Sequence, residues 1–381
     1  MRFALALSLT LALAPAAFAQ ATEQPPAATP PTLAEVRAEM DIPSRSPELR
    51  GQRDSVGFAS TAKQMARVWE LSATPPAPDS LGPLPPPGVV AVVCPHDDYL
   101  YAGRVYRRVL PLVTARTVVL LGVFHKHGRF DARDRLVLDG YRAWRTPDGP
   151  ARVSVLREAL VGHLLPDDHV RSNAMHDSEH SIEALVYWLK HIRPDLEIVP
   201  ILVPAAGLGR LDELAGRLAG ALRSAMEVRD LQLGRDVAVV VSTDGVHYGA
   251  DFGYVPYGDG GQAAYEQAVA RDRELLDGPL SGTVTPKKIR ALNESFVDPE
   301  NPGEYRLTWC GRYSVPFGLL LLRHLARLSG PVTGWPVAYA TSVGAPPLPL
   351  RDVGLGATAP ASLQHFVSYP AVAYTFGKRK K

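Results

Sequence analysis

Histidine side chains follow three separate apolar runs of this sequence, and a cysteine comes late in the chain. His96, His125 and His247 each stand just after a short run rich in β-branched residues, and Cys310 precedes a glycine. Runs of this kind, ending at Gly, Pro or Asp, predict buried parallel strands. The carboxyl ends of such strands face the crevice in which α/β proteins bind ligands. Because imidazole is the commonest metal ligand and a frequent general base, the pattern predicts an active site at this edge of the sheet.

The segments after the first two runs carry further polar groups. In residues 94–103 (CPHDDYLYAG), we expect His96 to ligate a metal and Asp98 and Tyr99 to contact substrate, although a lone histidine after a strand is also typical of a capped surface residue. His125 and His127 form an H-x-H pair whose side chains would point the same way in an extended segment. We favour His125 as the ligand and His127 as a substrate contact; the alternative is an exposed loop.

Two later segments contain candidate acid–base groups. In residues 177–183 (DSEHSIE), Ser178 to Ser181 are expected to cap a helix, with His180 as an acid–base group and Glu183 reaching the substrate. For Glu183 the alternative is an acidic residue favoured by the helix dipole. In residues 242–249 (STDGVHYG), Asp244 and His247 are expected to orient each other and to serve as catalytic groups.

Two nucleophilic alternatives follow from the same residues. Ser242 would suit a Ser-His-Asp hydrolase, but no GxSxG elbow surrounds it. Cys310 with a histidine base would suit a thiol nucleophile, whereas thiolate ligation of a metal accounts for more of the histidines. In an exported protein, Cys94 and Cys310 could instead form a disulfide.

Strands and helices alternate along most of the chain. Strands are expected over residues 89–93, 117–122, 198–203, 237–242 and 337–342, with short β segments at 135–138 and 143–146. Helices are expected over 60–71, 103–110, 181–191, 208–224, 262–276, 286–292 and 315–328, and a Thr32–Glu35 capping box opens another. This order predicts an α/β fold with a mostly parallel central sheet and helices on both faces.

The ends of the chain have a different composition. Residues 1–19 have the charged, apolar and A-x-A regions of a signal peptide cleaved after Ala19, which predicts a periplasmic or secreted protein. We divide the remainder into a Pro/Ala-rich leader (20–31), a helical arm and connector (32–87), the α/β domain (88–377) and a basic tail (378–381).

Overall composition restricts the partners. The formal net charge of +2 does not indicate a nucleic-acid-binding protein. No apolar stretch is long enough for stable membrane insertion. No Gly-rich phosphate loop follows the strands, so a nucleotide cofactor is not supported. We expect a small-molecule substrate, with a protein partner as a further possibility.

Five ordered segments of the chain resemble the Memo family, known in bacteria as AmmeMemoRadiSam system protein B. The resemblance extends from roughly Arg53 to Ser342. The matching segments are 95–103 (family P-H-A-G-Y-x-Y-S-G), 120–125 (L-L-G-P-x-H), 179–183 (E-H-S-I-E, unchanged), 199–203 (V-P-I-L-V), and 242–249 with 310–311 (S-S-D-x-S-H-Y-G and C-G). The resemblance implies a fold like that of class III extradiol dioxygenases.

The resemblance also implies a metal site built from His96, His125 or His127, and Cys310. The family's second motif often reads H-H, whereas Lys126 separates the two histidines here, and Asp97 and Asp98 replace its Ala-Gly. Two imidazoles and a thiolate suit iron(II) or copper better than magnesium or calcium. The leading expectation is a metal-dependent, dioxygenase-like redox enzyme; the alternatives are a non-catalytic peptide or small-ligand binding protein and a metal-assisted hydrolase.

Overall fold

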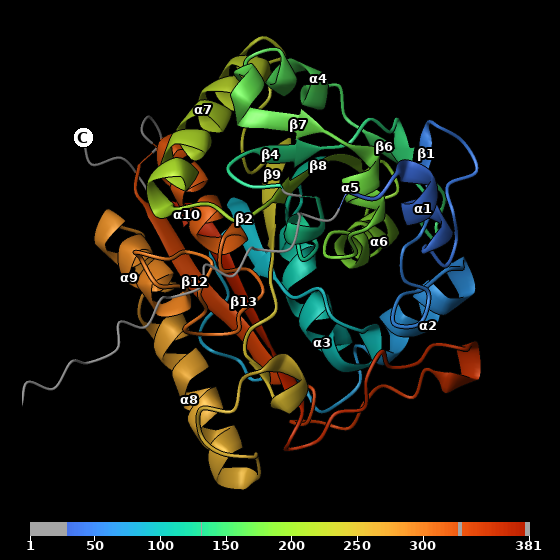
Figure 1. The fold of residues 1–381 in the computed structure, drawn as a ribbon, viewed down its shortest axis with the longest axis vertical. Helices are drawn as coiled ribbons and strands as arrows, with labels where there is room; N and C mark the ends of the chain where they lie inside the picture. Colours follow the sequence, from blue (N-terminus) through green and yellow to red (C-terminus); the bar gives the residue numbers. More distant parts are fainter. Residues whose placement is uncertain (1–28, 131, 327–329, 378–381) are drawn as a thin grey trace, which may run out of the picture.

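The computed structural model describes residues 29–130, 132–326 and 330–377 (Figure 1). The predicted signal peptide, most of the leader and the basic tail lie outside the described residues. Within the described part, no helix is both long and apolar enough to cross a membrane.

Four parallel strands form the centre of one large sheet. Their spatial order is β8 (Glu197–Val203), β3 (Thr117–Val123), β9 (Val237–Ser242) and β2 (Val89–Cys94). Val119 lies opposite Val199 on one side and Val239 on the other. These strands are buried almost throughout because helices cover both of their faces. The predicted strands and the mostly parallel sheet are confirmed.

Alternating residues of the central strands enter two separate cores. Val119 and Leu121 belong to the core that includes α7 (Leu208–Glu227) and α10 (Ser314–Leu325). Val118 and Leu120 belong to the core that includes α3 (Tyr99–Val109) and α6 (Glu183–Ile192). The period of two in a strand places neighbouring side chains on opposite faces. Figure 1 shows these two pairs of helices on opposite sides of the strands.

Beyond β2 the sheet continues with antiparallel strands. β13 (Phe366–Phe376) pairs with β2 and with β12 (Val332–Thr341), and β11 (Gly282–Thr283) forms the edge. The sequence analysis did not predict β13, which contains Pro370. Pro370 pairs only with β12 and precedes the part of β13 that pairs with β2, so its missing N–H costs no bond to β2.

The other end of the sheet is made of short strands. They are β6 (Ala151–Val153), β5 (Ala143–Trp144) and β1 (Leu49–Arg50), with β4 (Leu136–Leu138) and β7 (His169–Arg171) paired beside β8. The remaining α-helices are α1 (Leu33–Ala38), α2 (Ala62–Leu71), α4 (Leu156–Val161), α5 (Asn173–Asp177), α8 (Gln262–Asp277) and α9 (Pro286–Phe296). The predicted capping box of Thr32 and Glu35 is present at α1.

The N-terminal arm is part of this sheet. Its strand β1 pairs in parallel with β5, and α2 packs beside α3 and α6. The loop that follows β1 therefore has a fixed position against the domain, and residues of this loop reach the site described next.

Candidate metal centre

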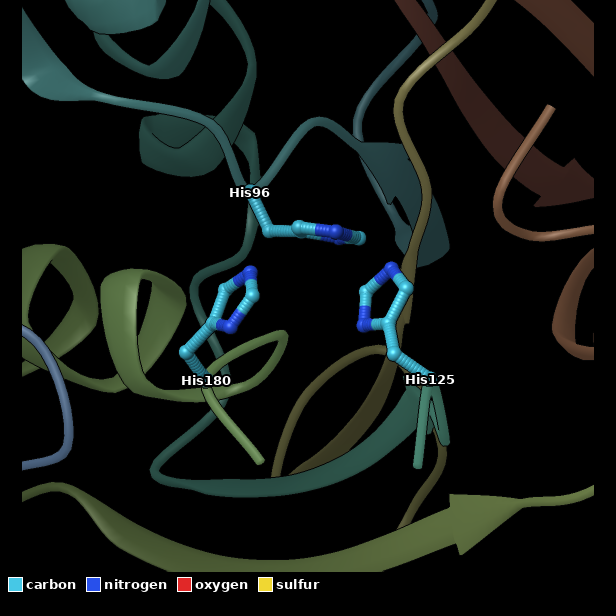
Figure 2. Close-up of side chains that lie close together, drawn as sticks. All are labelled: His96, His125 and His180. Carbon is cyan, nitrogen blue, oxygen red and sulfur yellow. The ribbon is translucent and has the colours of Figure 1, made fainter. Parts of the chain in front are cut away.

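Three imidazoles meet where strands of the central sheet end. His96 follows β2, His125 follows β3, and His180 precedes α6. The ring centroids are 5.3 Å apart for His96 and His125, 5.8 Å for His96 and His180, and 5.2 Å for His125 and His180. Each ring offers a nitrogen within 4.8 Å of the other two. Figure 2 shows the three rings facing a common space from three separate segments.

The tautomer of His96 is fixed by Ser242 at the end of β9. The hydroxyl of Ser242 donates its one proton to the carbonyl oxygen of Ser181 at 2.5 Å. Nδ1 of His96, 2.7 Å from the same hydroxyl oxygen, must therefore be the donor in that contact. Nε2 of His96 consequently carries the free lone pair. The same geometry excludes Ser242 as a hydrolytic nucleophile, because its hydroxyl is fully buried and already engaged.

Glu179 fixes His125 in a similar way. One carboxylate oxygen lies 2.9 Å from Nδ1 of His125, and the other accepts the backbone N–H of His125 at 2.7 Å. The backbone N–H groups of His180 and Ser181 also donate to Glu179. Burial alone would raise the pKa of Glu179, but the imidazoles of His125 and His180 and the Ser181 N–H hold that pKa well below its usual value. A carboxylate that orients a histidine by its second nitrogen is a recurrent partner of metal ligands.

Cys310 approaches His96 from another side. Its Sγ lies 3.6 Å from Nε2 of His96 and accepts the backbone N–H of Asp244 at 3.0 Å. Asp244, His96 and Cys310 also form a second group of possible ligand atoms within 4.8 Å of one another. Burial, followed by the charge of Asp244, raises the pKa of the Cys310 thiol well above its ordinary value.

The two cysteines do not form a disulfide in this structure. Cys94 and Cys310 are both free and buried. Cys94 lies within β2, in the core that contains α3 and α6. The sulfur of Cys310 is therefore available to a metal.

The predicted partnership of Asp244 with His247 is wrong. The Asp244 carboxylate instead accepts the backbone N–H of His96 at 2.8 Å and lies 3.3 Å from its Nε2. Nδ1 of His247 lies 3.1 Å from the carbonyl oxygens of both Gly245 and Thr308. Because a carbonyl only accepts, Nδ1 of His247 carries the proton and its Nε2 is unprotonated.

His127 does not join the group of possible ligand atoms formed by the three imidazoles. The H-x-H argument assumed an extended segment, but residues 124–126 form a turn and His127–Phe130 a 3-10 helix. The ring of His127 therefore lies near Tyr313 and lines a small cavity of about 60 Å³, which His125 and Cys310 also line. Burial and the charges of Arg312 and Arg133 lower the pKa of His127 to about 4. The substrate contact predicted for His127 is not supported.

Two further residues predicted to contact substrate lie inside the protein. The side chain of Tyr99 is fully buried, and its hydroxyl donates to the carbonyl oxygen of Ala184 at 2.8 Å. Glu183 is also fully buried and forms an ion pair with Arg50. The predicted serine cap of the helix is absent, since α6 has no side-chain cap and Ser181 donates to the carbonyl oxygen of Val123 instead. Tyr99 and Glu183 therefore stabilise the segments that carry the site from inside the protein.

A cavity of about 430 Å³ opens onto the imidazoles. The predicted residues that line it are His96, Asp98, His125, His180, Asp244 and His247. Both oxygens of Asp98 are engaged, because Oδ2 accepts the Thr358 N–H at 2.5 Å and Oδ1 accepts the Thr358 hydroxyl at 2.8 Å. Burial and then Asp97 raise the pKa of Asp98 to about 8. Asp98 thus holds a distant segment against the cavity.

Sequence reasoning missed several residues of this site. Glu179 stood in a recognised motif, but its role as the partner of His125 was not assigned. Asp54, Phe58, Thr358 and His365 also line the cavity and come from segments far apart in the chain. No local pattern singles them out, because their position depends on the pairing of β1 and β13 in the sheet.

Comparisons with known proteins agree with this architecture. A family model described as Memo-like protein matches residues 72–345. The chain is 29% identical over 231 residues to a MEMO1 family protein of Pyrococcus horikoshii, which covers 56% of this chain and 73% of that protein. It is 29% identical over 230 residues to a MEMO1 family protein of Methanosarcina barkeri, covering 57% and 80%. The chain therefore belongs to the family of Memo-like proteins.

Proposed function

We propose that this protein is a metal-dependent oxidoreductase with a dioxygenase-like active site that acts on a small organic substrate. The observation that carries the proposal is the convergence of unprotonated imidazole nitrogens from separate segments. Nε2 of His96 and of His125 are both left free by the partners of their Nδ1 atoms. We assign the metal to His96, which belongs to both groups of possible ligand atoms, with His125 and His180 from one group and Cys310 from the other.

The donor set fits a transition metal. Ligands bonded at about 2.1 Å for nitrogen and about 2.3 Å for sulfur in a tetrahedral arrangement are roughly 3.6 Å apart. His96 Nε2 and Cys310 Sγ are separated by 3.6 Å. Coordination deprotonates a thiol outright, so the raised pKa of the free Cys310 thiol lowers the apparent metal affinity but does not prevent ligation by the thiolate. Imidazole and thiolate donors favour iron(II) or copper over magnesium or calcium.

The bound ion would supply Lewis acidity and electron transfer. The protein's own residues orient the ligands and accept a proton. Ser242 and Glu179 hold His96 and His125 with their Nε2 atoms free. Nε2 of His247, which is unprotonated and belongs to a residue that lines the cavity, can take a proton from a substrate. Asp244 accepts the backbone N–H of His96 and so helps to position that ligand.

Metal analysis of tag-free protein tests this proposal. We expect one equivalent of iron or copper in the wild type, and loss of most of it in His96→Ala and Cys310→Ser. His163→Ala, at an exposed position, should retain the metal. Oxygen consumption should then be measured with a panel of catechols, alongside ester hydrolysis without oxygen. Unchanged metal content in both site variants would exclude this centre, and metal-dependent ester turnover alone would favour a hydrolase.

We also propose that the protein is exported to the periplasm or secreted. The support is the composition of residues 1–19 and the A-x-A sequence that ends at Ala19. Mass spectrometry of the native protein should find Gln20 as its first residue.

A further inference from the structure

Part of the cavity wall comes from segments outside the family match. Asp54 and Phe58 precede residues 72–345, and Thr358 and His365 follow them. The metal-facing side of the cavity is built by the matched region, whereas these additions complete the wall around a ligand. These four residues therefore contribute to the choice of ligand together with the matched region.

The wall carries carboxyl groups and imidazoles. Asp54, Asp97, Asp98 and Asp244 line the cavity, and no Lys or Arg is among the described residues that do so. Asp98 is occupied by Thr358, and Asp244 by His96. A divalent ion, if bound, would be held by the Cys310 thiolate with Asp244 nearby. The carboxylates of Asp54 and Asp97 remain for a ligand.

Asp54 is the more available of these two carboxylates. Its Oδ1 accepts the backbone N–H groups of Val56 and Gly57 at 2.8 and 3.2 Å, while Oδ2 has no hydrogen-bond partner among the described residues. Both oxygens of Asp97 already accept a hydrogen bond, one from Asp98 N–H and one from the Tyr369 hydroxyl. Asp54 therefore offers a free oxygen to the contents of the cavity.

The loop that carries Asp54 is held rigidly. The backbone N–H of Asp54 donates to Glu183 at 3.0 Å, and its carbonyl oxygen accepts from the Gln52 side chain at 2.8 Å. Glu183 is in turn paired with Arg50 inside the protein. A carboxylate held in advance loses little conformational entropy when it binds a ligand.

Aromatic side chains form the apolar part of the same wall. Phe58, Phe252 and Phe366 line the cavity together with Tyr101. Phe252 is stacked on His365, with ring centroids 4.5 Å apart. The negative faces of aromatic rings attract organic cations as well as apolar groups. The cavity therefore combines the features that recognise a cationic head and an aromatic body.

We propose that the substrate of this cavity is an organic amine: a primary ammonium bound by Asp54 and, secondarily, Asp97, carrying an apolar group of aromatic size. This inference rests on the proposed function for the identity of the site, since it names the class of substrate that the metal centre receives. The ammonium donates hydrogen bonds to the free Oδ2 of Asp54, and the apolar group lies against Phe58, Phe252 and Phe366.

Binding of three probes of similar size tests the proposal by calorimetry on metal-free protein. The probes are phenethylamine, 2-phenylethanol and phenylacetate, which are cationic, neutral and anionic. We expect the amine to bind at least about tenfold more tightly than the alcohol, as one charge-assisted hydrogen bond implies, and the anion to bind most weakly. Asp54→Asn should remove most of the preference for the amine, and Asp54→Glu should restore part of it.

Asp195→Asn is the matched control. It also removes one negative charge, but Asp195 lines a different pocket, just before β8, and not the cavity. It should leave the preference unchanged. Asparagine retains the Oδ1 acceptor for Val56 and Gly57, and thermal unfolding verifies that Asp54→Asn is folded. Absence of amine binding, equal binding of amine and alcohol, or an unaltered preference in Asp54→Asn would overturn the proposal. Because these measurements need no metal, they are independent of the metal analysis that tests the proposed function.

Discussion

The hydroxyl of Ser242 decides which nitrogen of His96 carries the proton. Ser242→Ala removes the acceptor for Nδ1–H without adding bulk, so the ring loses its fixed tautomer and orientation. Loss of such a partner typically lowers metal affinity by about 10–100-fold. We expect a decrease of this size in a competition titration against a metal chelator.

Ser72→Ala is the control for this substitution. Ser72 is also buried, but its hydroxyl has no hydrogen-bond partner among the described residues and it lies outside the cavity. The metal affinity of the Ser72→Ala variant should equal that of the wild type. Equal affinities for Ser242→Ala and the wild type would show that His96 is not oriented by this serine.

At the scale of elements, the loop after β1 packs tightly against the segment after β2. A Cβ placed on Gly57 would lie 1.8 Å from Oδ1 of Asp98, and the carbonyl oxygen of Gly57 accepts the backbone N–H of Tyr99. Gly57→Ala therefore forces these segments apart, and we expect it to lower the free energy of unfolding by about 1–3 kcal/mol. Urea denaturation of metal-free protein measures the change.

Gly220 in the middle of α7 provides the opposite case. A Cβ there meets no atom within 4 Å, so Gly220→Ala relieves only the poor helix propensity of glycine. We expect it to raise the free energy of unfolding by up to about 1 kcal/mol. A destabilisation by Gly57→Ala no larger than its experimental error would contradict the close packing of the two segments.

The elements also show what the sequence could and could not predict. The runs that became β2, β3 and β9 are unbroken and β-branched, so the parallel centre and the place of His96 and His125 were predictable. His127 was misplaced because the period-two argument fails once the chain turns into a 3-10 helix. β13 was missed because Pro370 interrupts an otherwise mostly apolar run, and proline is tolerated there only through the pairing of distant strands.

At the scale of the whole molecule, the site depends on partners far apart in sequence. Asp54 is held by Glu183, 129 positions later, and Asp98 binds Thr358, 260 positions later. Neither pair belongs to a motif, because each is created by the order of strands in the sheet. The sequence therefore predicted the two histidines that stand at strand ends, His96 and His125, but not the cavity wall around them.

Buried histidines couple the stability of the whole fold to pH. His176 is buried beside Trp144, with Nε2 3.1 Å from the carbonyl oxygen of Val137. Burial disfavours its charged form and lowers its pKa from 6.5 to about 4. Between these values the unfolded chain binds more protons than the folded one, so stability is lost as the pH falls from about 6.5 toward 4. The loss attributable to His176 reaches about 3 kcal/mol at full protonation.

His176→Gln isolates this contribution, because glutamine retains an amide donor for Val137 and does not titrate. We expect the free energy of unfolding of metal-free wild type to fall more steeply between pH 6.5 and 4 than that of His176→Gln, by up to about 1.4 kcal/mol per pH unit. The exposed-position variant His163→Gln should run parallel to the wild type. The remaining buried histidines titrate in all three proteins and cancel in the comparison. Parallel curves for wild type and His176→Gln would show that His176 is protonated equally in the folded and unfolded states.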